Sequence, residues 1–363
     1  MRILIMALLA VSVSFAKVSV SVSIIPQAFF VQKIAGNLAE VNIMVQKGKS
    51  PETYEPLIKE LEKLSKSQIY FTIGMPFENA WQKRFEGVNP NLKIIAPLQK
   101  GELEAYLAEY GDLADSHFHK DFDDLSGKSN ESSHESSEAK SKSNSDSRES
   151  SDNPHEIRGS ILDEKSGYGR HEQGNKTDSL LTKRVASIPD LSLKDERESH
   201  IHRHYPHIWL SFKLSKAHAK VISDNLCEID APNCAIYKRN LARFEKEINK
   251  MFAHFKSVFG NKGGAFLVYH PAFSYIANEL GLKEFAIEKD GKEAKIAHTK
   301  EILELIKKHN IKVIFTQPQF SSKNAQILAK EAKISLKTAD PLAFDWLENM
   351  NLFLSQLAKT MGH

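Results

Sequence analysis

The chain has 363 residues, of which 41% are hydrophobic and 26% are charged. Its 49 basic and 46 acidic side chains leave a net charge of +3, which argues against a dedicated nucleic-acid binder, because phosphate contacts require a clear basic excess. The length suggests about two domains and supplies enough apolar material to build cores without metals or disulfides.

The first residues predict export. Met1 and Arg2 form a short basic start, the run 3–13 is apolar, and Ser14-Phe15-Ala16 has the pattern of a cleavage site. We therefore expect a signal peptide over residues 1–16; the alternative is a buried N-terminal strand or helix. The apolar run is shorter than the ~20 residues needed to cross a bilayer. No later segment is predicted to span a membrane, so we expect a soluble periplasmic protein.

Short strands alternate with helices after the signal. Residues 17–25 alternate apolar and polar side chains, the period-two pattern of a strand. Further strands are predicted at 41–45, 69–73 and 92–95, with helices at 29–38 and 55–64. This alternation favours a parallel sheet built from βα units.

A polar insert interrupts this pattern. Between residues 126 and 156 the only hydrophobic residue is Ala139, so we expect a disordered His/Ser-rich insert over 117–204. It holds eight of the fifteen histidines of the chain: His117, His119, His134, His155, His171, His200, His202 and His204. The dense ends suggest auxiliary metal capture by His117, His119, His200, His202 and His204; the alternative is a plain linker.

A long helix and a second run of βα units follow. From Ala235 to Phe259 the apolar residues recur every three or four positions on one helical face, and Gly260 marks the end. The next predicted strands are 265–269, 284–288, 313–316 and 336–338, and the helices are 273–280, 299–309, 323–333 and one from about 344.

The expected fold is α/β, with two βα lobes joined by one long rigid helix. The N-terminal lobe would comprise 17–116 and 205–232, the linking helix 233–259, and the C-terminal lobe 260–363. Cys227 and Cys234 lie in a turn-rich segment. The spacing between them is longer than that of the cysteine pairs in zinc ribbons. Because export makes the compartment oxidising, we expect a disulfide between them, with two free thiols as the alternative.

Several metal-capable residues stand where such a fold binds ligands, beyond the carboxyl ends of strands. Glu52 and Glu55 follow the strand that ends near residue 45, and His207 stands where the chain re-enters the first lobe. His270 and Asp340 each end a strand of the second lobe. Alone, such a histidine is more often structural and such an aspartate a turn former. Together they indicate a divalent transition-metal site.

The ordered motifs resemble a known family. These motifs are Gly-x-Ser-Pro-x-x-Tyr-Glu-Pro, Pro-His-Ile-Trp-Leu, Tyr-His-Pro-Ala-Phe-x-Tyr, Gln-Pro-Gln-Phe and Ala-Asp-Pro-Leu. They are similar to the metal-specific solute-binding proteins of ABC importers, in the zinc-uptake, ZnuA-like branch. The resemblance implies one metal between the lobes, with His207, His270 and Asp340 at ligand positions. Glu52 stands where zinc-uptake proteins carry histidine.

The resemblance implies a periplasmic, high-affinity zinc-binding component that is monomeric, is not an enzyme, and delivers its ion to an ABC permease in the inner membrane. The oxygen ligand Glu52 shifts the preference towards Mn²⁺ or Fe²⁺, so a carrier of those metals is the alternative. A metal-dependent adhesin of the same fold and an exported metallohydrolase are further alternatives. The sequence has no His-Glu-x-x-His, Gly-x-Ser-x-Gly or phosphate-binding glycine loop.

Overall fold

The computed structural model describes residues 17–111, 206–260, 262–288 and 296–363, with side chains from 299 onwards in the last range. The chain divides into two units, Met1–Asn130 with Arg197–His363, and Glu131–Glu196. The second unit, the predicted signal peptide and the predicted insert 117–204 lie outside the described residues.

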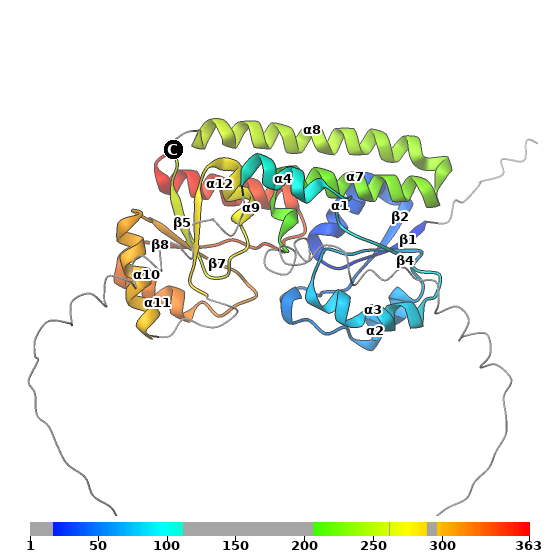
Figure 1. Cartoon of the computed structure of the whole chain (residues 1–363), viewed down its shortest axis with the longest axis horizontal. Coiled ribbons are helices and arrows are strands. Elements are labelled where there is room, and N and C mark those ends of the chain that lie inside the picture. Colours follow the sequence, from blue (N-terminus) through cyan, green and yellow to red (C-terminus); the bar gives the residue numbers. More distant parts are fainter. Residues whose placement is uncertain (1–16, 112–205, 261, 289–295) are drawn as a thin grey trace, which may run out of the picture. The chain divides into compact units, whose positions relative to one another are not determined.

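The described residues of the first unit form two separate four-stranded sheets, and all strands in each are parallel. The sheet of the N-terminal lobe has the order β2-β1-β3-β4 (Figure 1). Its strands are β1 Val18–Val22, β2 Ala39–Ile43, β3 Ile69–Phe71 and β4 Lys93–Ile95. The central strand β1 is buried on both faces, and its polar Ser21 is satisfied by a hydrogen bond with Ser67.

The sheet of the C-terminal lobe has the corresponding order β6-β5-β7-β8. Its strands are β5 Ala265–Val268, β6 Lys283–Ala286, β7 Val313–Thr316 and β8 Ser335–Thr338. In both sheets the chain first adds a strand on one side of the first strand and then crosses to its other side. The carboxyl ends of β1 and β3, and of β5 and β7, therefore flank the switch points where parallel sheets bind ligands.

Helices cover these sheets. Those of the N-terminal lobe are α1 Ile25–Ala35, α2 Ile58–Leu64, α3 Pro76–Val88, α4 Glu102–Tyr110 and α7 Phe212–Ile229. Those that follow are α8 Cys234–Phe259, α9 Ser274–Leu280, α10 Ile296–Lys308, α11 Lys323–Ala332 and α12 Trp346–Met361. The predicted α/β class with two βα lobes and a long connecting helix is confirmed, whereas the exact domain boundaries stay a prediction.

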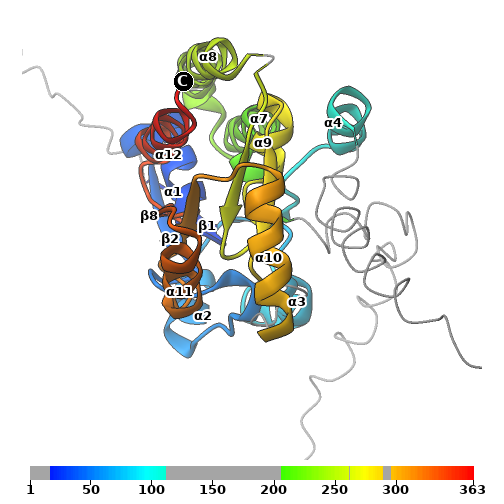
Figure 2. The same cartoon turned by 90° about the vertical axis from the view of Figure 1, so that its left-hand side faces the viewer.

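The long helix α8 packs against elements of both lobes. It contacts α1 and α7 on the N-terminal side and α9 and α12 on the C-terminal side (Figures 1 and 2). The helix is followed by Gly260, whose φ is +51°. Residues that carry a Cβ rarely adopt this backbone conformation. Among the described residues, no helix is both long enough and apolar enough to cross a membrane.

Buried hydrogen bonds join the lobes. The Trp209 indole N–H donates to the Pro341 carbonyl (2.7 Å), and the Trp346 indole N–H donates to the Trp209 carbonyl (2.6 Å). Glu279 of α9 accepts the backbone N–H of Phe212 (2.8 Å) at the first turn of α7. Because both lobes also contribute to one continuous apolar core, they are packed as a single body rather than as two loosely linked halves.

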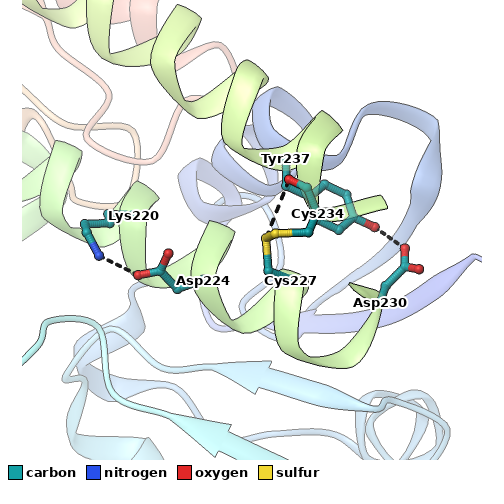
Figure 3. Close-up of a disulfide and its surroundings, with 6 residues drawn as sticks. All are labelled: Lys220, Asp224, Cys227, Asp230, Cys234 and Tyr237. Carbon is teal, nitrogen blue, oxygen red and sulfur yellow. Dashed lines mark hydrogen bonds and ion pairs between the residues drawn. A yellow bond between two sulfur atoms is a disulfide. The ribbon is translucent and has the colours of Figure 1, made fainter. Parts of the chain in front are cut away.

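The predicted disulfide is present. Cys227 in the last turn of α7 is bonded to Cys234, the first residue of α8 (Figure 3). Asp230, in the turn between the two helices, accepts hydrogen bonds from the Tyr237 hydroxyl and the Asn233 amide. The bond therefore fixes the reversal that starts α8.

Candidate metal centre

Three segments that are far apart in the sequence each present one donor. Glu52 lies in a one-turn 3-10 helix, Pro51–Thr53, in the loop after β2. His207 directly precedes a second such turn, Ile208–Leu210, whose three residues are all buried. His270 lies two residues beyond the end of β5. The first two belong to the N-terminal lobe and the third to the C-terminal lobe.

These donors converge. Glu52 Oε1 lies 2.8 Å from His270 Nε2 and 3.5 Å from His207 Nε2. One ligand atom from each residue lies within 4.8 Å of the other two, and no other group of this kind occurs among the described residues. Tetrahedral zinc with bonds of ~2.0–2.2 Å places neighbouring donors about 3.3–3.6 Å apart. The group therefore fits a small divalent ion after a shift of about half an ångström between Glu52 and His270.

His270 is held from several directions. Its Nδ1 lies 2.8 Å from Glu288 Oε2, and because a carboxylate only accepts, Nδ1 donates. The Gln317 amide clamps its backbone, accepting its N–H (3.1 Å) and donating to its carbonyl (2.6 Å). The Phe320 ring stacks on the imidazole at 4.8 Å. These contacts direct Nε2 towards Glu52, the arrangement in which a carboxylate orients a metal-binding histidine.

The loop carrying Glu52 is also anchored. The single hydrogen of the Tyr54 hydroxyl is shared between two acceptors, the Met44 carbonyl (2.7 Å) and Glu60. Glu60 accepts the backbone N–H of Leu57 as well (2.7 Å), at the start of α2. Glu52 itself is 28% exposed, whereas the side chains of His207 and His270 are 9% and 10% exposed. The carboxylate is thus the donor nearest to solvent.

Burial and neighbouring charges give the two histidines opposite properties. Burial, with a contribution from His270, lowers the pKa of His207 to about 3. Burial also acts to lower the pKa of His270, but its hydrogen bond to Glu288 and the close Glu52 carboxylate outweigh it and raise the pKa to about 9. The pKa of Glu52 lies below its usual value, because His270 and His207 outweigh the effect of burial. At neutral pH, an incoming cation would therefore take the place of the proton on His270.

A small cavity lies at these donors. Its volume of about 20 Å³ suffices for one occupant the size of a water molecule or an ion. Its wall combines the donors with apolar and amide side chains: Ser50, Pro51, Glu52, Met75, His207, Trp209, His270, Gln319, Phe320, Pro341 and Leu342. Because most of this wall is apolar, a bound ion would be shielded from water.

The other predicted site residues lie apart from this group. Asp340 is not a member of it: its Oδ1 accepts the Gln319 amide (2.8 Å) and the backbone N–H of Leu342 (3.0 Å). Its role as a ligand stays a prediction. Glu55 is exposed and is also outside the group. The five histidines expected to capture metal, His117, His119, His200, His202 and His204, lie outside the described residues.

Sequence reasoning missed the residues that support His270, namely Glu288, Gln317 and Phe320. Glu288 follows β6 and Gln317 follows β7, the two neighbours of β5 in the sheet. Two signals were available: the polar side chain just beyond each of these strands, and the Gln-Pro-Gln-Phe motif, which contains Gln317 and Phe320 but was used only for the family resemblance.

Comparisons with known proteins identify the family of the chain. A sequence model of the family described as "Zinc-uptake complex component A periplasmic" (ZnuA) matches residues 20–360. The chain belongs to this family. A structure described as "Crystal structure of ZnuA" is similar with a TM-score of 0.65 and 24% identity, covering 95% of this chain and 99% of that one. At that identity, the likeness supports the fold alone.

Curated relatives match over a shorter stretch. A "Putative metal-binding protein" of Treponema pallidum is 28% identical over 149 residues, which is 38% of this chain and 47% of the relative. The "Zinc-binding protein AdcA" of Streptococcus pyogenes is 30% identical over 153 residues, 41% of this chain and 30% of the relative. The chain thus spans less than half the length of these relatives.

Proposed function

We propose that this protein is the zinc-binding component of an ABC-type importer, which captures one ion between its lobes and delivers it to a membrane permease. The observation that carries this proposal is the convergence of Glu52, His207 and His270 from two lobes on one small cavity. Family membership supports the same function, and the AdcA relative is named for zinc binding.

The donor set favours zinc over manganese or iron. Two imidazoles and one carboxylate suit four-coordinate zinc, which fills its last position with one more donor. Mn²⁺ prefers a larger, oxygen-rich shell. Two of the three converging donors are imidazole nitrogens, so fewer positions remain for the oxygens that Mn²⁺ prefers. Glu52 remains compatible with Zn²⁺ and supplies the negative charge that two neutral imidazoles lack.

The proposed mechanism is capture and release without bond-making chemistry. Glu52, as the more exposed donor, meets the ion first, and the two buried histidines complete the site. Hydrogen bonds between the lobes favour small tilts and loop movement over wide hinge closure. A permease that contacts both lobes would then loosen the site by separating Glu52 from His270.

We propose that the protein acts as a monomer in the periplasm after export, with an inner-membrane permease as partner and no nucleic-acid partner. The family description is periplasmic, which supports this location. Catalysis is not part of the proposal. The sequence carries none of the hydrolase motifs considered above. An adhesin role would use the same metal site.

Metal binding by the purified mature chain tests this proposal. Zinc affinity would be measured by competition with a chromogenic chelator, in parallel with Mn²⁺ and Fe²⁺. We expect one tight zinc site per chain, lost in His207→Ala and His270→Ala and weakened in Glu52→Gln. His254→Ala, which removes an exposed histidine of α8, is the matched control and should leave the affinity unchanged. Tighter binding of Mn²⁺ than of Zn²⁺ would contradict the proposal.

A further inference from the structure

We propose that Gln319 supplies the fourth donor to the ion through its side-chain oxygen, and that Asp340 orients Gln319 instead of binding the metal. This inference rests on the proposed function, because it names the remaining ligand of the same site. It differs from the expectation drawn from the sequence motifs, in which the Asp340 carboxylate was the ligand.

Hydrogen bonds fix which way the Gln319 amide faces. Its nitrogen lies 2.8 Å from Asp340 Oδ1, and a carboxylate can only accept there, so the NH₂ group points to Asp340. The same Oδ1 also accepts the backbone N–H of Leu342 at 3.0 Å. One oxygen of the Asp340 carboxylate is therefore engaged by two donors, and Asp340 is not part of the Glu52–His207–His270 group.

The oxygen of the same amide is left without a partner. Gln319 Oε1 is buried and has no hydrogen-bond partner among the residues that the structure describes, and Gln319 lines the cavity at Glu52, His207 and His270. A buried carbonyl oxygen without a partner costs about 1–3 kcal/mol. A cation in the cavity would supply the missing partner, because amide oxygens are metal ligands.

The topology places Gln319 better than Asp340. Gln319 follows β7, which pairs directly with β5, the strand that leads to His270. Asp340 follows β8, the edge strand on the far side of β7. The crevice of a parallel sheet lies at the switch between its first strand and the neighbour added after the reversal, here β5 and β7. Asp340 instead lines a separate surface hollow with Lys337, Asn349 and Lys359.

A neutral fourth donor has a consequence for charge. With Glu52 as the single anionic ligand, bound Zn²⁺ retains one net positive charge, whereas a second carboxylate from Asp340 would neutralise it. An ion whose charge is not fully neutralised by its ligands is costly to bury among apolar side chains, so it is bound less tightly. The amide donor therefore suits a carrier that must also release its ion.

Four variants test the assignment by their zinc affinity. Asp340→Asn keeps the oxygen that accepts from Gln319 and Leu342 but removes the charge, so we expect a change of less than about threefold. Asp340→Ala and Gln319→Leu should each weaken zinc binding by roughly tenfold to a hundredfold. The double variant Asp340→Ala/Gln319→Leu should be no weaker than Gln319→Leu, because both changes remove one oriented oxygen. Gln326→Leu, on the exposed face of α11, is the control.

The visible spectrum of the cobalt-substituted protein is a second measurement, and a purely structural effect of a substitution would not change it. The visible bands of Co²⁺ report its donors, so the spectrum should change in Gln319→Leu and stay unchanged in Asp340→Asn. An altered spectrum in Asp340→Asn, or an affinity loss equal to that of Asp340→Ala, would overturn the inference and assign the metal to Asp340. An unchanged affinity and spectrum in Gln319→Leu would also overturn it.

The same measurements separate this inference from the proposed function. If the unaltered chain binds zinc through His207 and His270 but Gln319→Leu has no effect, only the assignment of Gln319 fails. If the unaltered chain binds no zinc, both fail. Thermal unfolding of each metal-free variant identifies any loss of affinity that comes from a failure to fold, and the conservative Asp340→Asn keeps the test decisive in that case.

Discussion

The buried histidines of this chain have different roles, and the role of His218 in α7 is structural. Its Nδ1–H donates to the Pro97 carbonyl (2.7 Å), so its unprotonated Nε2 accepts from the Gln27 amide nitrogen (3.1 Å). The orientation of that amide is fixed, because Gln27 Oε1 accepts the backbone N–H of Ser23 (2.9 Å). A second proton on His218 would face the N–H of Gln27 and meet repulsion, so the fold requires the neutral ring.

The pH dependence of stability should reveal this requirement. Burial lowers the pKa of His218 to about 4, against about 6.5 when unfolded. The stabilisation is therefore complete above pH 6.5 and is lost as the pH falls towards 4, at a cost of about 3 kcal/mol. His218→Gln keeps a donor and an acceptor but does not titrate. Denaturant unfolding should show a smaller decrease over this range in the variant, and equal decreases would contradict the argument.

At the metal centre, Glu288 is expected to act through His270. Because Glu288 accepts from Nδ1 and keeps Nε2 oriented, Glu288→Ala should lower zinc affinity by roughly tenfold to a hundredfold. Glu288→Gln retains an acceptor but no charge, so its zinc affinity should lie between that of Glu288→Ala and that of the unaltered protein. Chelator competition measures both. Glu247→Gln removes a surface partner of Lys33 and should have no effect; a similar loss there would point to a general charge effect.

The candidate site could be predicted from the sequence in part. Glu52, His207 and His270 were found because each follows a strand or re-enters a lobe next to a recognisable motif. Gln319 was not selected, because its signal depends on which strands are neighbours. The motif order places Asp340 and Gln319 equally well at strand ends, and only the sheet order β6-β5-β7-β8 distinguishes them.

At the scale of elements, strands were easier to predict than helices. The C-terminal strand 313–316 was predicted at its observed bounds, since a fully buried apolar run has few alternative interpretations. Helix α7 was missed although it has 18 residues. Its buried face includes Ser215, His218 and Ser223, and these polar side chains interrupt the apolar stripe by which helices are recognised. Tertiary hydrogen bonds, which sequence periodicity does not report, satisfy the first two of them.

The disulfide between α7 and α8 should stabilise the fold without affecting the metal. It closes a short loop, for which the loss of chain entropy in the unfolded state corresponds to about 2–3 kcal/mol. Cys227→Ser/Cys234→Ser should therefore lower the free energy of unfolding by that amount in denaturant titrations. Zinc affinity should stay unchanged, because Glu52, His207 and His270 all lie outside these two helices. A weaker metal site in this variant would show that the helix pair positions the donors.

At the scale of the whole described unit, the lobes share their interior. One apolar cluster runs from Val20 of β1 through Phe244 of α8 to Phe353 of α12. Trp209 and Trp346 add buried hydrogen bonds across the seam, that is, the boundary between the two lobes. Two separate sheets would by themselves suggest two domains that unfold independently. The continuous core instead makes the stability of each lobe depend on the other.

Metal-free protein should consequently unfold in one calorimetric transition, with equal calorimetric and van't Hoff enthalpies. Zinc donors come from both lobes, so the ion should raise the whole transition, by about 4 kcal/mol at a free concentration of 1,000 times its Kd. The variant His270→Ala should still unfold in one step. Zinc should raise its transition much less, because His270 is the one member of the Glu52–His207–His270 group that comes from the C-terminal lobe. Two resolved transitions, or a shift by zinc confined to one of them, would show that the seam is too weak to couple the lobes.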